Sequence, residues 1–328
     1  MDQLNFQTCT VKQQILGSHI MSNQIEVAIF SFNRGKYLKN CLESVRKSMP
    51  LASIKIYDDN SDCVETVSYL KSLGAMVKYT DQNLQGRHGN LYSNMQMALE
   101  HADHTFLLFL QDDCQVIREL GENDISHIRS IFSDPEIGFL RPQLMKSSDV
   151  DRWKRELRSA EDKRAYYPID AFNKVAFGNA YSDVVLADVA KLRAKKWEFS
   201  QSERFIQSFA KTAFKHMPFM ANGFVFYCPE VPSYRNKKLF LASRIAQRRL
   251  NGGISAFKML TQSQNSDFTQ RDIELWPVAE IYLTPSNSDV VKPFLYQDYK
   301  KSKSLLLIYK LERGLFKIGR FLISIFKT

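Results

Sequence analysis

The 328-residue sequence lacks several patterns that would each point to a class of protein. Its five cysteines are odd in number, scattered and never closely paired, which argues against a disulfide framework and a cysteine-based zinc site and favours a reducing compartment. No uncharged apolar run reaches the ~18 residues of a transmembrane helix. The N-terminus lacks the basic-then-apolar order of a signal peptide. A cytoplasmic location is therefore the expectation.

Two phosphate-binding fingerprints are also missing. No G-x-G-x-x-G follows the first apolar run, and no G-x-x-x-x-G-K-[ST] occurs. Cradling of a phosphate by a glycine-rich helix start is therefore not indicated. If a nucleotide diphosphate binds, its charge must be met differently, and a divalent cation held by carboxylates would do so.

Acidic residues are scarce in the last third of the chain. Residues 1–230 hold 28 basic and 28 acidic residues, whereas residues 231–328 hold 17 basic and 7 acidic, so 17 − 7 gives the whole net charge of +10. Nucleic-acid binding proteins usually carry such charge as a patch on the folded domain, so nucleic acid is not an expected partner. A basic end can equally bind an anionic membrane surface.

Strand-like and helix-like patterns alternate in the first part of the chain. Four short apolar runs predict strands at residues 25–31, 53–57, 75–79 and 105–110. Three segments of helical spacing lie between or beside them, at residues 36–48, 64–73 and 90–100. The alternation predicts an α/β fold with a mainly parallel central sheet flanked by helices.

Three regions are expected along the chain: a loosely held N-terminal extension (residues 1–22), a domain of residues 23–240, and a basic C-terminal extension (residues 241–328). The segment 146–164 has few large apolar residues and is expected to be exposed, on the acceptor side. The recurrence of Ile308, Leu311, Leu315, Ile318, Leu322 and Ile325 at spacings of three and four predicts a basic amphipathic helix over about residues 303–327. Contact with an anionic membrane is the favoured interpretation, and a seam against the body or a second copy is the rival.

Polar clusters follow three of the predicted strands, at residues 30–33, 58–62 and 112–113. The carboxyl ends of parallel strands meet at one edge of the sheet, where ligands bind, so these clusters are expected to converge. Two aspartates directly after an apolar run repel each other, an arrangement that suits a Mg²⁺ or Mn²⁺ site better than a structural turn. Arginines that cap both carboxylates and leave no room for an ion would overturn that metal site and the function built on it.

Three segments resemble the family 2 inverting glycosyltransferases of the GT-A fold, of the type that builds bacterial surface polysaccharides. They are Val27–Arg34, Ile56–Asp62 and Leu108–Asp113. The second of these resembles the D-D-x-S-x-D signature of the family. The resemblance covers about residues 25–235. It implies a GT-A fold and a metal-assisted, inverting transfer of a sugar from a nucleotide donor, most often UDP-linked, to a saccharide or lipid-linked saccharide.

The resemblance also implies roles for individual residues. Asp59 would bind the uracil, and the nucleotide site would further include Phe30, Ser31, Asn33, Asp58, Arg87 and Asp112. Asp113, with Asp112 beside it, would hold the cation. Glu203 would be the general base, with Asp183 in reserve, and Tyr234 and Arg235 would close over the diphosphate.

Two departures from the family pattern keep an alternative open. Gln111 stands where relatives sometimes have an acid, and Glu203 is followed by Arg204 instead of a second acid. A catalytically inactive module that binds carbohydrate or a partner is therefore the second interpretation. A nucleotidyltransferase is disfavoured because its glycine-rich loop is absent.

Overall fold

The computed structural model describes residues 24–79, 91–160, 165–169, 180–199, 202–235, 238–249 and 253–325. They form two compact units. The first contains the described residues up to Phe226 together with Met259–Tyr282, and the second contains Tyr227–Lys258 and the residues from Leu283 onward. The boundaries that we placed at residues 22/23 and 240/241 from the sequence remain predictions.

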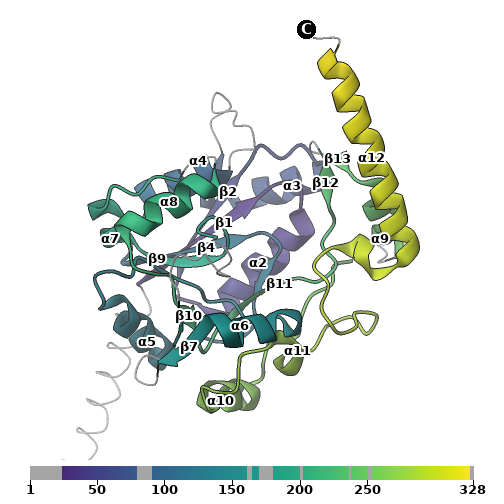
Figure 1. The fold of residues 1–328 in the computed structure, drawn as a ribbon. Coiled ribbons are helices and arrows are strands. Elements are labelled where there is room, and N and C mark those ends of the chain that lie inside the picture. Colours follow the sequence, from purple (N-terminus) through teal and green to yellow (C-terminus); the bar gives the residue numbers. More distant parts are fainter. Residues whose placement is uncertain are drawn as a thin grey trace, which may run out of the picture. The chain divides into compact units, whose positions relative to one another are not determined.

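The first unit is built on a six-stranded sheet with the order β3-β2-β1-β4-β9-β6 (Figure 1). Its strands are β1 (Ile25–Ser31), β2 (Ser53–Asp58), β3 (Val77–Tyr79), β4 (Phe106–Gln111), β6 (Phe139–Leu140) and β9 (Val185–Asp188). β1 pairs in parallel with both β2 and β4, β2 pairs in parallel with β3, and β9 is antiparallel to both of its neighbours. The predicted α/β fold with a mainly parallel sheet is confirmed.

The helices that connect the parallel strands begin and end close to their predicted positions. They are α2 (Gly35–Ser48), α3 (Val64–Leu73) and α4 (Leu91–Glu100). Gly74 ends α3 with a φ of 58°, a left-handed conformation that favours glycine. The predicted strand at 75–79 is shorter than expected, because residues Gly74–Met76 form a 3₁₀ turn, η1, before β3 begins.

The first unit contains further helices and short strands outside this sheet. They are β5 (Cys114–Val116), α5 (Glu122–Phe132), η2 (Ser147–Asp149), α6 (Val150–Glu156), β7 (Leu157–Ala160), β8 (Ala165–Pro168), α7 (Val189–Ala194), α8 (Glu203–Ala213), β10 (Phe219–Met220), β11 (Val225–Tyr227, its last residue in the second unit), α10 (Gln262–Gln270) and α11 (Ala279–Tyr282). Within the described part of segment 146–164, most residues are exposed or half-buried, as expected, and the expectation is wrong for two of them. Trp153 and Leu157 are buried in a separate apolar cluster with Tyr166, because α6 and β7 turn these side chains inward.

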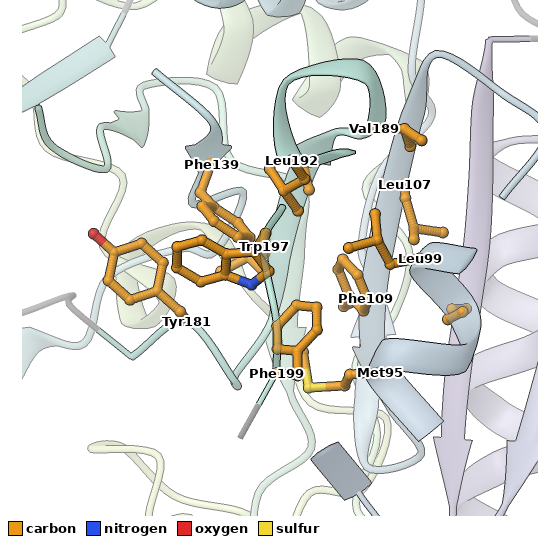
Figure 2. Packing of buried hydrophobic residues seen from close by; sticks show 14 of the residues in the cluster. Met95, Leu99, Leu107, Phe109, Phe139, Tyr181, Val189, Leu192, Trp197 and Phe199 are labelled. Carbon is orange, nitrogen blue, oxygen red and sulfur yellow. The ribbon is translucent and has the colours of Figure 1, made fainter. Parts of the chain in front are cut away.

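An aromatic cluster fills the core on one face of the sheet (Figure 2). The Trp197 and Phe139 rings lie 4.8 Å apart between centroids, and Phe199 packs against Phe109 of β4 at 5.3 Å. Met95 of α4 and Leu192 of α7 join the same cluster. Burying each large apolar side chain contributes about 1.5–3 kcal/mol, so this cluster fixes β4 firmly beneath the residues that follow it.

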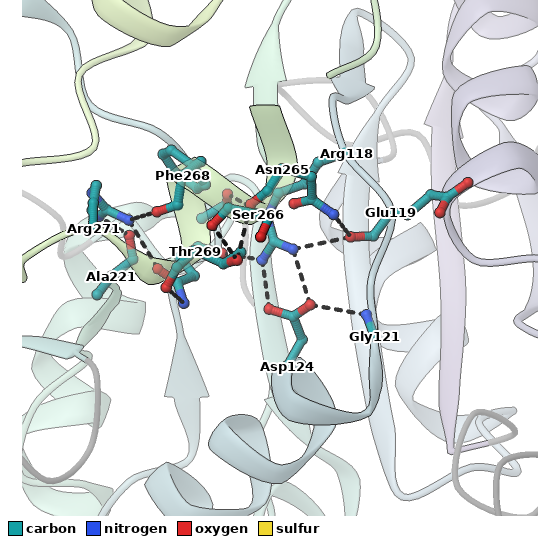
Figure 3. A network of polar contacts seen from close by, with 12 residues as sticks. Arg118, Glu119, Gly121, Asp124, Ala221, Asn265, Ser266, Phe268, Thr269 and Arg271 are labelled. Carbon is teal, nitrogen blue, oxygen red and sulfur yellow. Dashed lines mark hydrogen bonds and ion pairs between the residues drawn. The ribbon is translucent and has the colours of Figure 1, made fainter. Parts of the chain in front are cut away.

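A buried arginine anchors the chain just beyond β5 (Figure 3). Arg118 is fully buried, and its two terminal nitrogens donate to the two carboxylate oxygens of Asp124 at 2.9 and 2.6 Å. It also donates to the carbonyl oxygens of Glu119 at 3.0 Å and Gly223 at 3.2 Å. A buried charge is tolerated only when it is paired and hydrogen-bonded in this way. The network ties the segment after β4 to the start of α5.

The second unit contains a short hairpin and two packed helices. Its elements are β12 (Tyr234–Arg235), β13 (Lys238–Leu239), α9 (Leu241–Arg249), η3 (Asp298–Lys301) and α12 (Lys303–Ile325). The predicted C-terminal helix is confirmed over residues 303–325. Of the helices in the described residues, none combines the length and the apolar character needed to cross a bilayer.

Candidate functional site

The three predicted polar clusters lie at one edge of the central sheet. The parallel register pairs Ser31 with Asp58 and Phe30 with Gln111, so β1, β2 and β4 end side by side. The main-chain N–H of Asp59 donates to Ser31 O, and that of Asp112 donates to Phe30 O, both at 2.9 Å. The strand order reverses between β1 and β4, which is where open α/β sheets bind ligands.

Asp58 and Asn33 hold the loop that follows β2. The Asp58 carboxylate accepts hydrogen bonds from Ser61 N–H at 2.7 Å and Ser61 Oγ at 2.6 Å. Asn33, at a φ of 54°, accepts at Oδ1 from the N–H groups of Asp62 and Cys63, both at 2.9 Å. Neither Ser61 nor Asp62 caps α3 with its side chain, and Asn33 from the β1 loop instead accepts from the N–H groups that precede this helix.

Two other predicted nucleotide-binding residues have unsatisfied polar atoms. Within the residues that the structure describes, Ser31 Oγ and Asp59 Oδ1 are both buried and have no hydrogen-bond partner. Leaving such a group without a partner costs about 1–3 kcal/mol, so it is rare in a native protein without a reason. Phe30 differs, because its ring belongs to the core, stacked on Phe109 at 6.0 Å. Only its main chain faces this edge.

The acidic doublet lies in the turn directly after β4. Asp112 and Asp113 are 3% and 4% exposed. A single nitrogen of Arg34, Nη1, donates to Asp112 Oδ1 at 3.2 Å and to Asp113 Oδ2 at 2.5 Å. The other oxygen of Asp112 accepts from Phe32 N–H at 3.2 Å. One guanidinium nitrogen therefore lies between the two carboxylates.

Electrostatics explain why the doublet holds a cation. Burial raises the pKa of Asp112 to about 7, against the lowering effect of Arg34, and the neighbouring charge of Asp113 raises it further. Above this pH both carboxylates are ionised, and with the one guanidinium they give the group a net charge of −1. The doublet thus attracts further positive charge, from a metal ion or from a ligand.

A divalent cation at this site would have the two carboxylates of the doublet as its protein ligands. Asp112 and Asp113 direct carboxylate oxygens at one point, and such hard oxygens are the ligands that Mg²⁺ and Mn²⁺ prefer. That point is taken by Arg34 Nη1, the arrangement that we expected to argue against a metal. No group of three or more His, Cys, Asp or Glu side chains in the described part of the chain could hold one. The donor chemistry fits a cation, but only once Arg34, whose side chain is 21% exposed, has moved away.

The two candidate bases lie close together. Glu203, the first residue of α8, accepts a hydrogen bond from Tyr181 N–H at 2.8 Å and another from Ser182 Oγ. Asp183, which follows Ser182 in the chain, forms an ion pair with Arg141 at 2.8 Å. The antiparallel register pairs Val185 with Phe109, so Asp183 comes two residues earlier, at the same end of β4 as Gln111. Both carboxylates are therefore held on the β9 side of the doublet.

The structure does not test the positions of three other predicted residues at this edge of the sheet. Arg87 lies outside the described residues. Tyr234 and Arg235 belong to the second unit, where they form β12 and pair with Leu239 and Lys238 of β13. Their role at the diphosphate stays a prediction.

Sequence reasoning assigned no role to Arg34. The available signal was its position: a basic residue three places beyond β1, next to a strand that ends in two acids. Because neighbouring parallel strands end together, the guanidinium and the acids could have been expected to meet.

Comparison with known proteins agrees with this geometry. Residues 26–134, about a third of the chain, match the family model described as Glycosyl transferase family 2. Because the match covers less than half of the chain, it shows a similarity to this family over these residues. This segment contains β1, β2, β4, Arg34 and the acidic doublet. The predicted family resemblance and its α/β fold class are confirmed. No curated protein matched the sequence.

Solved structures with a similar fold include TarS of S. aureus. The structure of TarS residues 1–349 in complex with UDP-GlcNAc is 15% identical with a TM-score of 0.46, over 75% of this chain and 70% of that one. The complex of the same fragment with UDP is 14% identical with a TM-score of 0.39, over 75% and 69%. Similarity this low leaves the activity of the chain to be argued from its own residues.

Proposed function

We propose that the protein is a glycosyltransferase that moves a sugar from a UDP-sugar to a hydroxyl group of a saccharide or lipid-linked saccharide, with inversion. The observation that carries this proposal is the pair of buried, unpartnered oxygens, Ser31 Oγ and Asp59 Oδ1, beside the acidic doublet in the segment similar to family 2. A nucleotide base would supply hydrogen-bond partners for the two unpartnered oxygens, and a diphosphate suits the charges of Arg34 and the acidic doublet.

Asp59 is the residue best suited to recognise the base. Both oxygens of Asp58 are already used by Ser61, whereas Asp59 Oδ1 has no donor among the described residues. A carboxylate accepts but does not donate, so it selects a base that presents an N–H, as uracil does at N3. The main-chain bond from Asp59 to Ser31 O fixes this carboxylate at the end of β1.

The doublet and Arg34 together suit a diphosphate. A guanidinium binds phosphate oxygens through two parallel N–H donors, so Arg34 has a natural partner when it leaves the carboxylates. Asp113 and Asp112 would then hold a Mn²⁺ or Mg²⁺ ion, and such an ion, when bound, neutralises the charge that develops on the departing diphosphate.

The transfer itself is a single displacement. The acceptor oxygen bonds to the anomeric carbon while the bond from that carbon to the phosphate oxygen breaks, and the diphosphate leaves with the electron pair. A carboxylate takes the proton of the acceptor hydroxyl. We assign this to Glu203, with Asp183 as the alternative, because these two side chains lie together at the end of β4.

The second unit suggests where the acceptor is found. Residues 300–328 carry 8 basic and 1 acidic residue, so 8 − 1 gives +7 of the net charge. An acceptor held in an anionic membrane would account for this charge, and we place the protein at the cytoplasmic face of such a membrane. Nucleic acid is not part of the proposal, and a homodimer stays an alternative use of the C-terminal helix.

One observation favours a second candidate. Arg34 covers the doublet and Glu203 is engaged by two hydrogen bonds, as in a site that binds but does not react. The alternative function is therefore a family 2 module that binds a carbohydrate or a partner without catalysis.

Hydrolysis of sugar nucleotides distinguishes the two candidates. The wild-type protein is incubated with a panel of UDP-sugars and Mn²⁺, and UDP release is measured beside Asp113→Asn and the exposed control Asp151→Asn. The proposal predicts release by wild type and control, and a loss of at least about 100-fold in Asp113→Asn, the usual effect of removing one charge-stabilising group. Equal release by all three would refute the catalytic role of the doublet.

A further inference from the structure

Helix α12 of the second unit has one face packed against its neighbours. Leu305 is 3% exposed and lies in a cluster with Ala242 and Ala246 of α9. Tyr309 stacks on Tyr299, with ring centroids 3.8 Å apart and an angle of 7° between the planes. Other elements of the second unit, α9 and η3, thus cover one side of this helix.

A second apolar face of α12 is exposed. Leu307, Leu311, Leu315 and Ile318 are 58%, 60%, 72% and 58% exposed. Their spacings of four, four and three place them in one row along the helix, which we call the apolar row. Of the predicted apolar face, Leu311, Leu315 and Ile318 are exposed, whereas Ile308 is half-buried against the cluster of α9 and η3. Exposed leucines arranged in a row mark an interaction surface.

A row of positive charge runs beside the apolar row. Lys303, Lys310 and Lys317 recur every seven residues and therefore lie above one another on the helix. Two of them line a groove of about 570 Å³ between η3 and α12. Its lining is formed by Gln297, Tyr299, Lys300, Leu306, Tyr309, Lys310, Arg313, Gly314 and Lys317. Four of these residues are basic and none is acidic, so the groove suits a phosphate group.

We propose that α12 lies on the surface of an anionic phospholipid bilayer, with the apolar row in the boundary between headgroups and acyl chains and a lipid phosphate in the groove. Basic residues beside an apolar row are the pattern of helices that lie in this boundary. This inference deepens the proposed function, because it locates the membrane contact on α12. It does not depend on the transfer chemistry.

Charge favours an anionic bilayer over a second copy of the chain as the partner of this helix. The helix residues Lys303–Ile318 contain four basic side chains and one acidic side chain, Glu312, which accepts a hydrogen bond from Leu241 N–H at 2.8 Å. Two such helices would bring their lysine rows together, and like charges repel. An anionic bilayer instead pairs with every lysine in the row.

Vesicle binding tests the proposal with two pairs of variants. Full-length protein is sedimented with phosphatidylcholine vesicles and with vesicles that contain ~30% phosphatidylglycerol. The apolar row is changed by Leu311→Gln with Leu315→Gln, and its control is Ile281→Gln, an isoleucine of α11 that is 67% exposed. The lysine row is changed by Lys310→Gln with Lys317→Gln, and its control is the exposed pair Lys154→Gln with Arg155→Gln.

The expected result is binding to the anionic vesicles only. At about fivefold per basic residue near the surface, the double lysine variant should bind roughly 30-fold more weakly, and its control, which loses the same charge, should bind as wild type does. The apolar-row variant should lose binding and Ile281→Gln should keep it. Equal binding to neutral vesicles, or full binding by either test variant, would overturn the proposal. So would a variant that dissociates a dimer in light scattering while its vesicle binding is unchanged.

Release of UDP in solution separates this proposal from the proposed function. All four variants should release UDP from a UDP-sugar at the wild-type rate, since none alters the first unit's doublet. Loss of vesicle binding with hydrolysis intact supports the membrane site, whereas a protein that binds vesicles but never hydrolyses a UDP-sugar refutes only the transferase.

Discussion

Replacing Arg34 by methionine isolates the charge that holds the acidic doublet. Methionine keeps an unbranched stem but removes the guanidinium that lies 3.2 Å from Asp112 and 2.5 Å from Asp113. Breaking a buried ion pair by removing one partner costs 3–5 kcal/mol, and the 21% exposure of Arg34 places this case near the lower end, at about 3 kcal/mol. At roughly 2–4 °C per kcal/mol, we expect the melting temperature to fall by about 6–12 °C.

Manganese should reverse this loss selectively. With Arg34 gone, the two carboxylates are open to a cation, and Mn²⁺ at ~100 times its Kd would restore about 2.7 kcal/mol. Melting is followed by fluorescence with and without Mn²⁺, beside Arg152→Met, which removes an arginine from a surface ion pair with Glu156. That control should lose less than about 1 kcal/mol and should not respond to Mn²⁺. If Mn²⁺ raises the melting temperature of wild type and Arg34→Met equally, the guanidinium does not occupy the cation position.

Three further predictions concern recognition of the nucleotide base, the catalytic general base and the stability of the fold. Asp59→Asn should weaken UDP binding by about tenfold, because the amide can donate toward the base where the carboxylate only accepts; calorimetry measures this, and unchanged affinity would contradict it. Glu203→Gln should lower the transfer rate by about 10²–10⁴-fold with little change in KM, whereas the same loss confined to Asp183→Asn would make the reserve residue the base. Arg118→Met should destabilise the protein by about 3–5 kcal/mol in thermal melts, because Asp124 would be left buried and unpaired, and a variant as stable as wild type would refute that network.

The strands and helices around the site could be predicted because local patterns determine them. The apolar run at residues 25–31 and the helical spacing at 64–73 coincide with β1 and α3, and Gly74 ends α3 as expected. Parallel strands then bring Ser31, Asp58 and Asp112 to one edge without any knowledge of side-chain contacts. Hydrophobic periodicity and strand topology were therefore enough to predict the fold and the position of the site.

Side-chain pairing could not be predicted, because it depends on contacts between distant segments. Arg34 meets residues 78 and 79 positions away, and Asn33 bonds to the loop before α3. Trp153 was missed for a related reason: one large side chain among charged residues gives no periodic signal, yet it is buried by elements far along the chain. These contacts decide which predicted residues hold the loops and which are left for a ligand.

The affinity of the protein for UDP tests the central claim most directly. UDP is titrated calorimetrically into wild-type protein with Mn²⁺, with excess chelator, and into Asp113→Asn with Mn²⁺. A nucleotide site at the ends of β1, β2 and β4 predicts saturable binding in the first titration that is weakened at least about tenfold in the other two. Absence of UDP binding in all three titrations would contradict a nucleotide-sugar site at this edge of the sheet.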